Sequence, residues 1–146
     1  MTGELLEKIR RYAKLAAESL REKAREMEGT TIIEDEEIIP VWKNTADYSS
    51  APIGAPVKYG EQVYALVQPH NAGYYPGSTP AGLPALWRVL HTKDPAKAKP
   101  WVKPGGTSDM YLAGECMLWE DGKIYIAKRD TAYSPAEYPE GWEMAE

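Results

Sequence analysis

The chain has no phenylalanine, a single cysteine and only two histidines among 146 residues. Because Cys116 has no partner, a disulfide within the chain is excluded. Cys116, His70 and His91 also lack the Cys-x-x-Cys or His-x-x-x-His spacing of a zinc site, so we expect no metal and no cofactor. Neither histidine has the sequence context of a base beside a nucleophile, and the acids cluster in tails and turns. We therefore predict that the protein is not an enzyme.

Long apolar runs and an excess of basic residues are missing too. No run approaches the roughly 18 residues that span a bilayer, and acids precede any apolar run at the N-terminus, unlike a signal peptide. The net charge is −5, and residues 101–146 hold nine acids against four bases. A phosphate-tracking protein needs the opposite balance. We expect no nucleic acid, no membrane insertion and synthesis in the cytoplasm.

Large rings are abundant, with five tryptophans and ten tyrosines. These side chains join an apolar body to a polar group, which suits half-wet surfaces and interfaces. The alternative is that two tiny β-domains use them to fill small cores. The number of rings exceeds what two such cores can hide, so some are expected at the surface.

A pattern of aromatic residues and glycines occurs twice in the last hundred residues. The landmarks of the first copy are Trp42, Gly54, Val57, Tyr59, Tyr64 and Trp87. Those of the second are Trp101, Gly114, Met117, Trp119, Tyr125 and Trp142. The step from the first tryptophan to the glycine is 12 residues in one copy and 13 in the other. Such repetition predicts two similar units, each so small that mutual packing or oligomerisation should stabilise it.

Short apolar runs between turn residues predict strands within each unit. In the first, 57–59 and 62–67 form a hairpin turned at Gly60, and 85–90 closes the sheet. In the second, 116–119 and 123–127 pair across the Asp121-Gly122 turn, and 142–144 closes it. The predicted fold is mainly β with an N-terminal α-helix, in which two small antiparallel β-sheet modules, 40–90 and 101–146, stand in tandem. A solvated linker is expected over 91–100.

The first 29 residues form a separate predicted segment. Residues 4–28 lack Gly and Pro and are rich in helix formers, so we expect one amphipathic helix. Its stripe has heptad spacing and is apolar except for one lysine: Leu6, Ile9, Ala13, Ala16, Leu20, Lys23 and Met27. The stripe can pair with other copies as a coiled coil, with a trimer favoured, dock on its own β-units, or dock on another protein. The acidic segment 30–39 is predicted to be an extended hinge or linker.

The repeated pattern resembles a known family. Tyr111-x-x-Gly114-Glu, then Asp121-Gly-Lys-Ile-Tyr125 and the closing Gly141-Trp142, are similar to the family 5/12 carbohydrate-binding modules, or type 3 chitin-binding domains. The first unit, with Gly54-Ala-Pro-Val57-Lys-Tyr59, resembles the version in small tail-associated proteins of phages and prophages of Gram-positive bacteria. The resemblance covers residues 40–146, and it extends loosely to the plan of a helix followed by two modules.

The chain departs from the family pattern at several positions, of which two bear on the site and on the first unit. Sugar-binding members carry exposed rings just after the central tyrosine, where this chain has Gln68-Pro69-His70 and Arg129-Asp130-Thr131. The first unit also lacks the tyrosine three residues before Gly54.

Rings in the loops are the best candidates for sugar contact. They are Tyr74, Tyr75, Tyr133 and Tyr138, beside glycines and prolines where burial is difficult. Their polar neighbours are His70, Asn71, Asp130 and Thr131. A sugar offers a flat C–H face and a rim of hydroxyls, which rings and such polar groups match. The alternative is that these tyrosines pack on prolines to stiffen the loops. The tryptophans and central tyrosines of the repeat are expected in the core.

The resemblance implies a non-catalytic phage or prophage virion accessory protein. Its tandem modules would bind host-surface or cell-wall glycan, and its helix, residues 4–28, would join it to further copies or to other virion proteins. The alternative is a structural or assembly protein of a phage tail, baseplate or capsid that uses the modules for protein docking. A third possibility is the wall-binding part of a lytic enzyme.

Overall fold

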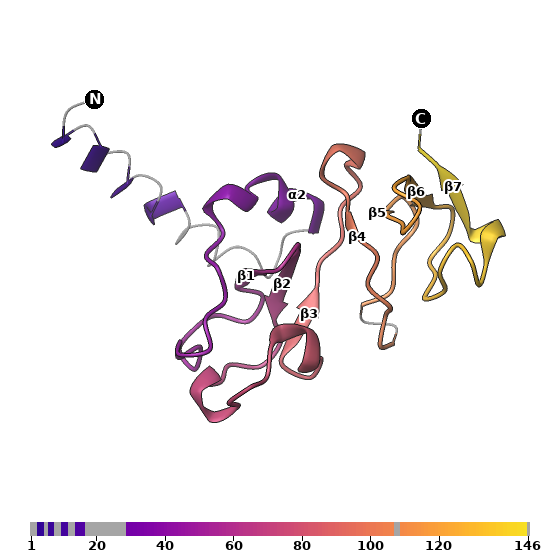
Figure 1. Cartoon of the computed structure of the whole chain (residues 1–146). Helices are drawn as coiled ribbons and strands as arrows, with labels where there is room; N and C mark the ends of the chain where they lie inside the picture. The colour runs from indigo at the N-terminus through magenta and orange to yellow at the C-terminus, as the bar shows by residue number, and fades with distance from the viewer. Residues whose placement is uncertain are drawn as a thin grey trace.

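The computed structural model describes residues 3–4, 6–7, 10–11, 14–16, 29–106 and 109–145. Its strands form two small sheets, one with the order β1-β2-β3 and one with the order β4-β5-β6-β7. The sheets follow one another along the chain and lie in different halves of the molecule (Figure 1). Short 3-10 turns and one short helix account for the other regular elements after residue 28, so the prediction of a mainly β protein is confirmed.

The first sheet contains β1 (Pro56–Tyr59), β2 (Gln62–Leu66) and β3 (Trp87–Val89), all antiparallel. The turn between β1 and β2 includes Gly60, whose φ of 60° is left-handed, a conformation that glycine adopts without strain. The predicted hairpin is therefore confirmed. Because side chains alternate along a strand, β2 sends Tyr64 to one face of the sheet and Val63 to the other.

The second sheet contains β4 (Lys99–Pro100), β5 (Cys116–Leu118), β6 (Ile124–Ala127) and β7 (Trp142–Met144). The last three strands are antiparallel, as predicted. β4 runs parallel to β5, so the prediction of an antiparallel sheet is wrong at this edge. The reason is the long connection between the two strands, which returns the chain to run in the same direction.

Equivalent backbone hydrogen bonds occur in both halves. In the first they are Trp42 N to Lys58 O, Tyr48 N to His70 O, Gly54 N to Leu66 O and Val67 N to Leu86 O. In the second they are Trp101 N to Leu118 O, Tyr111 N to Thr131 O, Gly114 N to Ala127 O and Lys128 N to Gly141 O. The two glycines have nearly the same left-handed φ, 92° for Gly54 and 91° for Gly114. The landmarks read from the sequence thus occupy equivalent places.

Tyr48 takes the place of the tyrosine that the first unit was predicted to lack. Its hydroxyl accepts a hydrogen bond from Lys43 N at 3.1 Å, and the Tyr111 hydroxyl accepts one from Val102 N at 3.2 Å. Tyr48 lies six residues before Gly54, whereas Tyr111 lies three before Gly114. Three extra residues in the first loop hide this equivalence in the sequence.

Segment 30–39 is not the extended hinge that its acids suggested. It forms α2 (Gly29–Glu34) and a 3-10 turn, η2 (Glu36–Ile38). Ile32 and Ile33 are fully buried and pack with Val63, Ala65 and Leu90 on the second face of the first sheet. Burial of Ile32, Ile33 and Ile39 decides the structure, whereas Glu34, Asp35 and Glu37 stay exposed.

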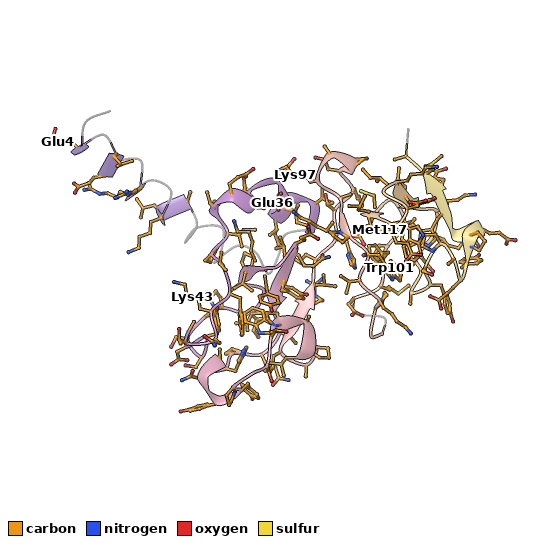
Figure 2. All side chains as sticks on the ribbon, in the orientation of Figure 1. Glu4, Glu36, Lys43, Lys97, Trp101 and Met117 are labelled. Atoms are coloured by element: carbon orange, nitrogen blue, oxygen red, sulfur yellow. The ribbon has the colours of Figure 1, made fainter. Side chains whose placement is uncertain are left out.

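The predicted solvated linker, 91–100, is also packed: its first two residues are buried, and two of its lysines form ion pairs. His91 and Thr92 are buried, and the carbonyl oxygen of Thr92 accepts from Cys116 N. Gly29 lies so close to His91 that an added Cβ would be 2.3 Å from the His91 carbonyl oxygen. Lys97 lies beside Glu36 of η2 (Figure 2). It also pairs with Glu37, and Lys99 pairs with Glu36. The segment therefore joins the covering helix of the first sheet to the second sheet.

Each half has its own aromatic core. In the first, Tyr48 meets Trp87 edge to face with ring centroids 5.1 Å apart. In the second, Tyr111 meets Trp142 in the same manner at 5.4 Å. Among the landmark rings, Tyr64, Trp87 and Trp142 are buried as expected, whereas the others are half-buried and pack against the two cores. Trp101 and Met117 lie within the second core (Figure 2).

Part of the predicted N-terminal helix falls on described residues. Those between residues 3 and 16 are helical, and all of them are exposed. They lie away from both sheets, at the opposite end of the molecule from β4–β7 (Figure 1). Residues 17–28 of the predicted helix, and the pairing of its stripe, lie outside the described part. No helix among the described residues is long and apolar enough to cross a bilayer.

Candidate carbohydrate-binding surface

Two exposed rings lie in the loop after β2. Tyr74 ends the short 3-10 turn η3 (Ala72–Tyr74) and is 80% exposed, and Tyr75 is 39% exposed. The turn begins at Asn71, whose side-chain oxygen accepts a hydrogen bond from Gly73 N at 2.9 Å. Asn71 therefore shapes the loop that presents the tyrosines, as side-chain caps commonly do.

His70 is buried beneath this loop and contacts one of its tyrosines. The side chain is 8% exposed, and Nδ1 lies 2.8 Å from the Gln68 carbonyl oxygen, to which it donates. Its ring meets Tyr75 and Trp87 edge to face, with centroids 5.7 and 5.4 Å away. Nε2 is buried and has no hydrogen-bond partner among the described residues. His70 thus positions Tyr75 and does not stand at the surface as a ligand contact.

One strongly exposed ring lies in the equivalent loop of the second half. Tyr133 is 60% exposed, and its carbonyl oxygen accepts from Trp142 Nε1 at 2.9 Å. The Tyr133 N–H donates to the hydroxyl of Thr131, which is 4% exposed. Asp130 is exposed, and its carboxylate accepts from Ala113 N at 2.8 Å. Thr131 and Asp130 therefore hold the loop, and Asp130 alone of the two also faces solvent.

Tyr138 is half-buried and has internal contacts. The Arg129 guanidinium lies over its ring, 5.8 Å from the centroid. An added Cβ at Gly141 would be 2.5 Å from Tyr138 Cδ2, so the ring lies directly against this glycine. Tyr138 matches the alternative in which a loop tyrosine stiffens its surroundings.

The predicted site residues thus form two groups and not one strip. Tyr74, Tyr75 and Asn71 are together in the first half, and Tyr133 and Asp130 in the second. Their loops follow β2 and β6 and lie at different ends of the molecule (Figure 1). Any shared ligand would have to span both halves.

Two hollows were not predicted. One, of about 540 Å³, has the exposed apolar side chains Ile53 and Val67 in its lining, together with Arg88 and Asp109. The other, of about 380 Å³, is lined by Glu61, Pro100, Trp101, Leu118, Trp119 and Glu120. Both combine residues from the two halves, so neither unit's sequence could reveal them alone.

Titratable groups with shifted pKa values gather between the halves. Burial lowers the pKa of His91 to about 4, although its contact with the Asp109 carbonyl oxygen opposes the shift. Burial raises the pKa of Glu115, whose carboxylate accepts from Leu112 N at 2.7 Å. Both line a cavity of only about 110 Å³. Shifted groups in a cleft can mark a functional site, but His91 also stacks on Tyr111 at 3.7 Å, which is packing.

No known protein family matches the chain, and no curated protein matches it. The resemblance to carbohydrate-binding modules therefore stays a prediction. Within residues 29–106 and 109–145, and the described part of the N-terminal helix, no group of three or more His, Cys, Asp or Glu side chains could hold a metal ion.

Proposed function

We propose that this is a non-catalytic virion accessory protein of a phage or prophage, whose two modules bind glycan on the host surface or cell wall. The observation that carries the proposal is the exposure of Tyr74 and Tyr133 in equivalent loops of the two halves. Such rings expose apolar surface to water, and the C–H face of a sugar can cover this surface. Nearby polar groups can form hydrogen bonds with the hydroxyls of the sugar.

The modular plan is part of the proposal. The recurring hydrogen bonds support two modules in tandem, and the spacing of the repeat supports the carbohydrate-binding family. Shallow sugar sites are weak one by one, whereas linked sites raise avidity by factors of about 10²–10⁴. The N-terminal helix would add copies, with a trimer as the favoured assembly.

Retention of the full-length protein on insoluble chitin and on purified Gram-positive cell walls tests the sugar sites. We expect Tyr74→Ala and Tyr133→Ala each to weaken retention about two- to tenfold, and the double variant to lose the avidity gain. Val41→Ala, which also shortens an exposed apolar side chain, is the matched control. Wild-type retention by the double variant would exclude these sites.

The alternative, a structural protein of a tail, baseplate or capsid, is favoured by one observation. Leu6 and Leu15 of the N-terminal helix are 38% and 54% exposed, which suits a contact with another protein. If wild-type protein is not retained by any of the glycans but co-purifies with other virion proteins, this second function replaces the first.

A further inference from the structure

The second sheet has an apolar row that stays partly exposed in the described structure. Register places Pro100 beside Leu118, Leu118 beside Ile124, and Ala145 N bonds to the Ile124 carbonyl oxygen. These four residues, here the outer row, lie on the face opposite the aromatic core, which contains Met117. Leu118 is 36% exposed and the other three are half-buried.

The first sheet shows what such a face requires. Val63, on the strand equivalent to β6, is 1% exposed because Ile32 and Ile33 of α2 cover it. The segment that leads into the second sheet has only η5 (Pro95–Lys97), which buries none of its residues. The face is thus closed by an isoleucine-bearing helix in the first half, whereas in the second half its row from Pro100 to Ala145 is only partly covered.

The described residues of the N-terminal helix, 3–4, 6–7, 10–11 and 14–16, are all exposed. Among its described residues Leu6 and Ala16 belong to the predicted stripe, and both are exposed. Four strands place the ends of the outer row about 14 Å apart, and the stripe from Leu6 to Ala16 extends about 15 Å. The row therefore matches the part of the stripe from Leu6 to Ala16 in length.

Charge favours the same match. Residues 1–16 hold four basic and two acidic side chains, and Arg10 and Lys14 flank the stripe on successive turns. Glu61 and Glu120 line the hollow beside Leu118 and are exposed. Neither forms a salt bridge with any described residue. A basic helix on an apolar row with acids beside it has complementary charge as well as complementary shape.

We propose that the outer row is the docking site for the N-terminal helix of a second copy of this chain. A second copy is required because the described helical turns lie at the opposite end of the molecule from β4–β7 (Figure 1). The inference rests on the oligomerising role proposed for the helix, and it names the surface that receives it. The helices then bind sheets of neighbouring copies and do not form a bundle with one another.

Substitutions on the two surfaces test this in the full-length protein. Leu118→Asp and Leu6→Asp should each weaken self-association at least tenfold, measured by sedimentation over a concentration series. Ala145→Asp gives a second, milder change in the outer row, because Ala145 is small and follows the last residue of β7. Met144→Asp and Leu15→Asp are matched controls, because Met144 is exposed on the opposite face and Leu15 is exposed off the stripe. Both controls should associate like wild type.

A cross-link between copies gives an independent readout. A copy with Leu6→Cys, mixed with a differently tagged copy with Leu118→Cys, should form a mixed disulfide on oxidation, and the pair Leu15→Cys with Met144→Cys should not. If Leu6→Asp dissociates the assembly while Leu118→Asp and Ala145→Asp do not, the helices bind one another and the docking proposal is wrong. If wild-type protein remains monomeric, the oligomerising role fails as well.

Discussion

The two sheets have equivalent hydrogen bonds and equivalent ring pairs, yet they differ in what covers the face opposite the aromatic core. The first has apolar side chains on both faces, with the aromatic core on one and α2 on the other. The second has an aromatic core on one face and a partly exposed row on the other. The same small β-unit can thus be completed by its own preceding segment or left to an external partner. Apart from the parallel edge strand β4, the halves differ in the burial of the second face of the sheet.

The largest expected effect tests this difference in cover directly. Ile33→Ala should lower the free energy of unfolding by about 2–5 kcal/mol, because Ile33 is fully buried and its truncation leaves a cavity. Ile124→Ala in the second sheet should cost about 1 kcal/mol or less, because its side chain is half-exposed. Urea unfolding at low protein concentration measures both. Equal losses would show that the second face is covered within one chain.

Acid should weaken the junction between the halves. The pKa of His91 is lowered from 6.5 to about 4, so below about pH 6.5 the unfolded chain binds a proton that the folded chain does not. Stability is therefore lost as the pH falls from about 6.5 to 4, by up to about 3 kcal/mol. His91→Gln should show a smaller loss over this range. The raised pKa of Glu115 acts in the opposite direction and is common to both proteins, so their difference isolates His91. Parallel pH profiles would contradict the assignment.

A methyl group at Gly29 should loosen the link between α2 and the second half. Its Cβ would lie 2.3 Å from the His91 carbonyl oxygen, a backbone atom that cannot turn aside. We expect Gly29→Ala to cost about 1–3 kcal/mol, as overpacking does. Gly82→Ala is the control, because nothing lies within 4 Å of its added Cβ. A neutral Gly29→Ala in thermal unfolding would mean that the two segments separate easily.

The smallest effect distinguishes the two equivalent tryptophans. Trp142 Nε1 donates to the Tyr133 carbonyl oxygen at 2.9 Å, whereas Trp87 Nε1 is buried without a partner among the described residues. Trp142→Phe should therefore cost about 1 kcal/mol more than Trp87→Phe in denaturant unfolding, because only the former loses a hydrogen bond. A larger loss for Trp87→Phe than for Trp142→Phe would show that Trp87 Nε1 has a hydrogen-bond partner.

Local chemistry made much of the fold predictable. The hairpins follow from turn residues such as Gly60 and Gly122, both left-handed in the structure, between short apolar runs. The parallel edge strand and the cover over Val63 could not be predicted, because each depends on packing between distant segments. The acids near Ile33 favoured a linker, and only tertiary burial of the isoleucines overrides that preference.

For the candidate site, the exposure of two tyrosines was predicted correctly, but the burial of two of their polar neighbours was not. Glycine and proline neighbours indicated that Tyr74 and Tyr133 would be exposed, and they are. His70 and Thr131 were expected beside a ligand because they adjoin these loops in the sequence. Both are buried, since His70 packs against Trp87, which lies far along the chain, and Thr131 supports its own turn. Sequence proximity indicates which residues share a loop but not which side of it they line.

The ring stack at the junction gives the molecule an optical label. Trp101 stacks on Tyr111 with centroids 5.1 Å apart, and Tyr111 stacks on His91. Trp119 and Trp142 lie within 6.1 Å of Trp101, so their transitions can couple in a fixed chiral arrangement. The second half should therefore dominate the near-ultraviolet circular dichroism. Loss of the near-ultraviolet signal would report unfolding of the second half. The far-ultraviolet circular dichroism of the backbone amides would still report the first half.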